Sequence, residues 1–118
     1  MNALDLSRLP VTKEAEVVVC GGGTAGVFAA IACAHQGKDT LLIEQFGSLG
    51  GTATNGLVTP LMTVHIPGNP QCSYLYNLLQ EKLLALGAGN KGGTAFDPLL
   101  LRYALEQMCV EAGVHLLY

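Results

Sequence analysis

The chain has 118 residues, of which 50% are hydrophobic and 13% are charged, and its formal net charge is −3. This length fits one domain, and the apolar content argues against disorder beyond the N-terminal residues. The lysines and arginines are scattered singly, so we expect no nucleic-acid partner and no anionic membrane partner. No apolar run approaches the roughly 20 residues that span a bilayer.

The N-terminus and the cysteines favour a location in the cytoplasm. Residues 1–15 form a lead-in that lacks the basic start and apolar core of a secretory signal. The four cysteines show no CxxC spacing and no histidine at metal-ligand distance; they are Cys20, Cys33, Cys72 and Cys109. We therefore expect buried, reduced thiols, no metal site and a cytoplasmic protein.

A strand–helix–strand unit begins the domain. The short β-branched stretch "EVVVC" (16–20) predicts a strand buried on both faces. Residues 24–36 follow a helical pattern rich in small side chains, and Gly37 suits the left-handed position that ends a helix. "TLLIE" (40–44) predicts a second strand, which completes a βαβ unit with parallel strands.

The second half of the chain predicts a long loop, two helices and a third strand. Residues 45–71 are irregular, and a loop of this length in a compact domain is usually functional. A leucine-rich helix starts at about residue 73 and ends before Gly87. Asp97 caps a further helix that Gly113 ends, and residues 114–118 predict a strand.

Glycines lie at the turn between the first strand and the first helix. Gly21, Gly23 and Gly26 form G-x-G-x-x-G, which allows a sharp turn, a close approach of phosphate and close packing of helix on strand. Thr24 and Ala25 offer backbone N–H groups at a helix N-terminus, where an anion is favoured without lysine. The motif predicts a diphosphate cradle for an adenine dinucleotide; the alternative is a tight turn that binds no phosphate.

An acidic residue ends the second strand. Glu44 follows Gly26 by 18 residues, and a carboxylate there can accept hydrogen bonds from ribose hydroxyls and repel a 2′-phosphate. The alternative is a strand-end charge in water.

The long segment between the second and third strands favours FAD over NAD. In one half of an NAD-binding Rossmann domain, a single helix connects the second strand to the third. In this chain residues 45–113 lie between these strands. The stretch from "VVVCGGGTAGVFAAIACAHQGKDTLLIEQ" through "FGSLGGTATNGLVTPLM" resembles the N-terminal segment of FAD-dependent oxidoreductases of the two-dinucleotide-binding-domain superfamily. "GGTAFDPLLLRYALEQMCVEAGVHLLY" is similar to the same family's approach to its third strand, so the resemblance covers residues 16–118.

The resemblance implies a set of cofactor-binding residues. The diphosphate would meet the first glycine loop, the adenosine ribose would meet the end of the second strand, and a second glycine element would lie between the phosphates and the flavin. These positions are Gly21, Gly23, Thr24, Ala25 and Gly26, then Glu44 and Gln45, then Gly50, Gly51, Thr52 and Ala53. Many relatives carry arginine after the glycine pair, whereas this chain has Thr52 and so lacks a cationic clamp at that position.

One side chain is a candidate for proton transfer. His65 is the only titratable residue in "GLVTPLMTVHIPGN" and could act as an acid or base beside the flavin or substrate. The alternative is a histidine hydrogen-bonded within a loop or facing solvent.

We therefore expect an α/β fold: a Rossmann-like βαβ unit with parallel strands and additional helices, in which residues 1–15 lead into an incomplete FAD/NAD(P)-binding domain (16–118). The expected function is the FAD-binding N-terminal portion of a flavin-dependent oxidoreductase with a small-molecule substrate, not catalytically complete alone. Uncovered sheet edges and helix faces favour a homo-oligomer that exchanges a strand or helix. The alternatives are a non-catalytic oligomerising fragment with an empty cradle, and an NAD-binding or thiazole-synthase-like protein.

Overall fold

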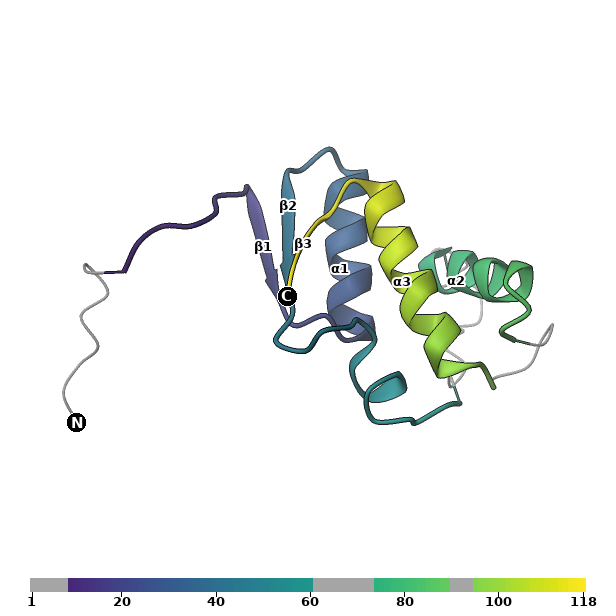
Figure 1. The fold of residues 1–118 in the computed structure, drawn as a ribbon. Coiled ribbons are helices and arrows are strands. Elements are labelled where there is room, and N and C mark those ends of the chain that lie inside the picture. The colour runs from purple at the N-terminus through teal and green to yellow at the C-terminus, as the bar shows by residue number, and fades with distance from the viewer. Residues whose placement is uncertain (1–8, 61–73, 90–94) are drawn as a thin grey trace.

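The computed structural model describes residues 9–60, 74–89 and 95–118, which form an α/β domain (Figure 1). In chain order its elements are β1 (Val17–Cys20), α1 (Thr24–His35), β2 (Thr40–Ile43), the 3-10 helix η2 (Gly51–Ala53), α2 (Tyr74–Ala85), α3 (Pro98–Ala112) and β3 (His115–Leu117).

The three strands form one parallel sheet in the order β1-β2-β3. Val18 pairs with Leu41, and Leu41 pairs with His115 on the other side. With β2 in the middle, the order corresponds to one half of a doubly wound dinucleotide-binding sheet, in which strand order reverses beside the first strand. The expected Rossmann-like α/β fold with parallel strands is confirmed.

Local signals explain where the helices begin and end. One carboxylate oxygen of Asp97 accepts hydrogen bonds from the amides of Leu99 (2.8 Å) and Leu100 (3.1 Å), and Pro98 occupies the first position of α3. Gly113 has a φ of 82°, so it ends α3 in the left-handed conformation that the sequence predicts.

The hydrophobic core lies between the sheet and the helices. Helices α1 and α3 pack on one face of the sheet, and α2 packs on the outer side of this helical layer, against α3 (Figure 1). The side chains that fill the interior include Val27, Ala30, Ile31, Leu42, Leu79, Leu83, Leu101, Leu105 and Met108. Leucines of α2 and apolar side chains of α3 therefore face the core.

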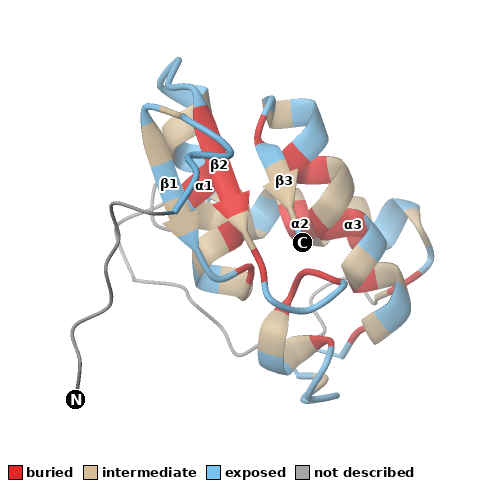
Figure 2. Cartoon of the chain, turned by 60° about the vertical axis from the view of Figure 1, so that its left-hand side comes forward, coloured by how far each residue is buried: buried red, intermediate tan, exposed pale blue. Residues whose placement is uncertain are grey.

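The expectation that β1 is buried on both faces is wrong. Val18 is 50% exposed and Cys20 is exposed, so β1 carries exposed positions whereas most of β2 is buried (Figure 2). The reason is that α1 and α3, which pack on the sheet, cover the same face of it (Figure 1). The expected burial of the thiols is correspondingly wrong for Cys20 and confirmed for Cys109, with Cys33 half-buried and Cys72 outside the described residues.

Candidate functional site

The first glycine loop connects β1 to α1 at the carboxyl end of the sheet. Gly21 turns the chain with a φ of 103°, a conformation that L side chains rarely adopt. Gly26 lies in the first turn of α1, and a Cβ on it would come within 1.8 Å of the carbonyl oxygen of Gly21. The helix can therefore approach the strand closely only because Gly26 has no side chain.

The N-terminus of α1 offers backbone donors that have no hydrogen-bond partner within the described part of the chain. The N-cap residue, Gly23, makes no side-chain cap, and the first turn contains no acidic residue. The amide of Val27 donates to the carbonyl of Gly23 at 2.9 Å, so the amides of Thr24, Ala25 and Gly26 precede the intrahelical ladder. A Cβ on Gly23 would meet no atom within 4 Å, which leaves open space in front of these donors.

The second glycine element lies directly against the first. The amide of Gly50 donates to the carbonyl of Gly22 at 2.8 Å, and Gly50 forms an isolated parallel bridge with Gly23. A Cβ on Gly51 would lie 3.1 Å from the Cα atom of Gly23, so the two backbones touch. Thr52 is exposed and Ala53 half-buried on η2. The structure thus brings together two sequence elements that are almost 30 residues apart.

Glu44 follows β2 and reaches back under the first glycine loop. Its side chain is buried, with a relative exposure of 6%. One carboxylate oxygen accepts a hydrogen bond from the amide of Gly22 (2.5 Å), and the other accepts from the amide of Phe46 (2.8 Å). Glu44 is therefore not a strand-end charge in open water, while its neighbour Gln45 is exposed.

Several residues that support this site were not identified from the sequence. A Cβ on Gly22 would lie 2.5 Å from the Leu49 side chain, which is fully buried beneath the loop. Thr54 is also fully buried, and its hydroxyl donates to the carbonyl of Leu49 at 2.6 Å. The unbroken run of three glycines was a signal for Gly22, but nothing in the local pattern singles out Leu49 or Thr54.

The arrangement fits the diphosphate and ribose of an adenine dinucleotide. It combines uncapped helix donors, two glycine backbones with open space before them and a carboxylate at the end of the next strand. The candidate base His65 lies outside the described residues. Within residues 9–60, 74–89 and 95–118, no group of three His, Cys, Asp or Glu residues is placed to hold a metal ion, and no helix is long and apolar enough to cross a bilayer.

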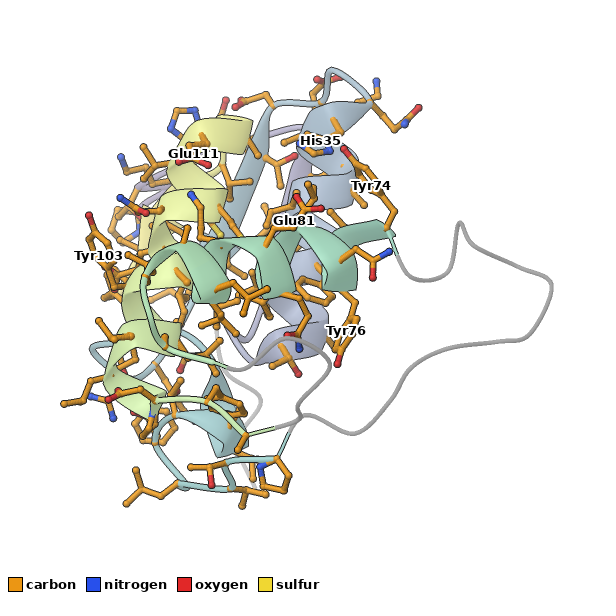
Figure 3. All side chains as sticks on the ribbon, turned by 90° about the vertical axis from the view of Figure 1, so that its right-hand side faces the viewer. His35, Tyr74, Tyr76, Glu81, Tyr103 and Glu111 are labelled. Carbon is orange, nitrogen blue, oxygen red and sulfur yellow. The ribbon has the colours of Figure 1, made fainter. Side chains whose placement is uncertain are left out.

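A separate hollow of about 400 Å³ lies on the outer side of the helical layer, between α1, α2 and α3. His35, Glu81 and Glu111 stand around it (Figure 3), and Lys82 pairs with Glu111 at 2.6 Å. It shares no lining residue with the glycine elements, so it is not part of the dinucleotide site.

A parallel α/β sheet with a glycine-rich turn before an uncapped helix defines the class of dinucleotide-binding proteins. The model of the family described as FAD dependent oxidoreductase matches residues 16–118. The chain belongs to this FAD-dependent oxidoreductase family, and its cofactor is FAD.

Individual relatives agree with this assignment. The chain is 43% identical over 54 residues to the dihydrolipoyl dehydrogenase of Vibrio cholerae, which is 45% of this chain and 11% of that protein. It is 31% identical over 106 residues to the bilirubin reductase of Mediterraneibacter gnavus, which is 90% of this chain and 16% of the reductase. The crystal structure of Thermovibrio ammonificans THI4 matches with a TM-score of 0.54 and 18% identity, over 86% of this chain and 37% of that one, which supports the fold. The chain thus spans only a small part of the curated relatives that it matches.

Proposed function

We propose that residues 16–118 bind the ADP half of FAD and form the cofactor-binding part of an oxidoreductase that acts on a small molecule. The observation that carries the proposal is the contact between Gly50 and the Gly21–Gly23 turn, in front of uncapped amides at the start of α1. Backbone N–H groups that converge in this way stabilise a diphosphate without a lysine.

The residues of the two glycine elements have proposed roles. Gly21 and Gly26 shape the turn, Gly23 leaves room for the diphosphate, and the amides of Thr24 and Ala25 bind phosphate oxygens. Gly50, Gly51, Thr52 and Ala53 would run along the cofactor from the phosphates toward the flavin. FAD, when bound, supplies the redox chemistry, and the protein supplies its position and electrostatic environment.

Competition between fragments of the cofactor tests which half this chain binds. The chain is titrated with FAD in a calorimeter, and then with FAD in the presence of excess ADP or excess FMN. Because the proposed contacts are with the diphosphate and the adenosine, we expect ADP to compete and FMN not to compete. Absence of FAD binding, as the empty-cradle alternative predicts, or equal competition by FMN would contradict the proposal.

Glu44 is proposed to bind the adenosine ribose in addition to its two backbone donors. A carboxylate has about four acceptor sites, so capacity remains for a ribose hydroxyl. Wild type should therefore prefer ADP over 2′-deoxy-ADP, by about 10-fold for one hydrogen bond to a charged acceptor. In Glu44→Gln this preference should disappear. If the variant binds both nucleotides more weakly but keeps the preference, Glu44 supports only the loop.

His65 stays the candidate acid or base for the reaction. Self-association of the domain through β1 is proposed as well, because this strand exposes Val18 and Cys20.

A further inference from the structure

Arg102 is a cation on α3 that points its side chain at the second glycine element. One terminal nitrogen of its guanidinium lies 3.4 Å from the carbonyl oxygen of Thr54, just after η2. Its Nε atom is buried and, among the described residues, has no hydrogen-bond partner. Neither feature was anticipated from the sequence.

Three contacts connect Arg102 to the first glycine loop. Arg102 approaches the carbonyl of Thr54, and the Thr54 side chain fills the space beside Gly50, where a Cβ would lie 2.3 Å from it. The amide of Gly50 in turn donates to the carbonyl of Gly22 at 2.8 Å. Thr54 therefore links Arg102 to the proposed diphosphate site through atoms in contact.

The hydrogen bonding of Arg102 is incomplete in this structure. A distance of 3.4 Å is longer than the 2.7–3.2 Å range of ordinary N–H···O hydrogen bonds. A buried N–H group without a partner is unfavourable, and a guanidinium presents its donors as a rigid fork. A small movement of the Gly51–Thr54 turn toward α3 would shorten the existing contact to the Thr54 carbonyl.

We propose that Arg102 is a positioning residue for the cofactor: its guanidinium braces the Gly51–Thr54 turn from α3 and so holds the second glycine element against the first, in the position that FAD binding requires. This inference rests on the proposed function. It also provides, from another element, a cation near the turn that contains Thr52.

Two substitutions separate the geometry of the Arg102 guanidinium fork from its positive charge. Arg102→Met removes both, and Arg102→Lys keeps the charge but not the fork. Lys38→Met is the matched control, because Lys38 is an exposed cation paired with Glu16 near the start of β1, away from the glycine elements. Each variant is measured for amide hydrogen exchange without cofactor, for melting temperature and for the FAD dissociation constant.

We expect Arg102→Met to accelerate exchange within residues 50–56 with little effect elsewhere, and to weaken FAD binding about 10-fold. Arg102→Lys should keep less than half of the protection from exchange and of the FAD affinity that Arg102→Met loses. Lys38→Met should match wild type. The inference is overturned if exchange in residues 50–56 is unchanged, if exchange rises uniformly with a fall in melting temperature, or if lysine replaces arginine fully. Failure of the wild-type chain to bind FAD would instead contradict the proposed function, while the exchange data without cofactor would still test the brace.

Discussion

Gly23 and Gly26 lie within one turn of each other at the start of α1, yet they lack a side chain for different reasons. A methyl group on Gly26 would collide with the backbone of Gly21, whereas a methyl group on Gly23 would enter empty space. At the scale of the single residue, one glycine therefore serves the fold and the other leaves room for a ligand.

This difference predicts opposite phenotypes for two alanine substitutions. Gly26→Ala should lower the free energy of unfolding by about 3 kcal/mol, because the clash is with backbone atoms that cannot rotate away. Gly23→Ala should leave stability within about 1 kcal/mol of wild type, since its φ of −65° and ψ of 174° suit alanine. Chemical denaturation and FAD titration of both variants measure the two effects.

Gly23→Ala should nevertheless weaken FAD binding at least 10-fold, because the new methyl group occupies the proposed diphosphate position. A Gly23→Ala chain that is stable and binds FAD as wild type does would show that the phosphates lie elsewhere.

At the scale of the element, α3 combines a surface cap with a fully buried thiol. Cys109 has no exposed surface, and its pKa is raised from an ordinary 9.0 to about 12, first by burial and then by the charge of Glu106. The thiol of the folded chain therefore stays protonated at a pH at which the thiol of the unfolded chain ionises.

Stability should consequently decline in alkaline solution. Because the pKa of the Cys109 thiol is higher in the folded chain, this thiol contributes stability that is complete below pH 9. The contribution is lost as the pH rises from 9 toward 12. Between pH 8 and pH 10 the loss should be about 1 kcal/mol, measured by urea denaturation. Cys109→Ala is the control: its unfolding free energy should change less over this interval, and an equal change in both chains would contradict the assignment. The pKa of Tyr118 is also raised, mainly by burial and its hydrogen bond to Glu106, so the comparison is kept at or below pH 10.

At the scale of the whole molecule, α1 and α3 pack on the same face of the sheet (Figure 1), and the described residues leave part of β1 exposed. Val18 is 50% exposed on β1, and this strand carries neither the lysine nor the proline that commonly protects an edge. We expect this apolar strand to make contacts between copies of the chain in solution.

Replacing Val18 by lysine tests that expectation. Wild type should sediment as larger species with increasing concentration, and Val18→Lys should shift the population toward monomer. Val110→Lys is a matched control, because Val110 is 68% exposed on α3 and is not part of the sheet. A monomeric wild type over the whole concentration range, or equal behaviour of the two lysine variants, would contradict a contact through β1.

Much of the architecture could be predicted from the sequence because its causes are local. The β-branched run before the glycines, the helical spacing after them and the cap at Asp97 depend on neighbours a few residues away. The glycine motif likewise depends on backbone contacts between residues a few positions apart. For this reason Gly21 and Gly26 could be identified together with their structural roles.

Only the tertiary structure revealed the contacts between distant parts of the chain. The Glu44 carboxylate binds the amide of Gly22, Thr54 packs against Gly50, and Arg102 reaches Thr54 from another helix. No short-range periodicity encodes such pairs, because each depends on how the sheet, the loop and α3 come together in space. The same reason explains the error about β1: a short apolar run predicts a buried strand, but the placement of the helices determines which of its faces is covered.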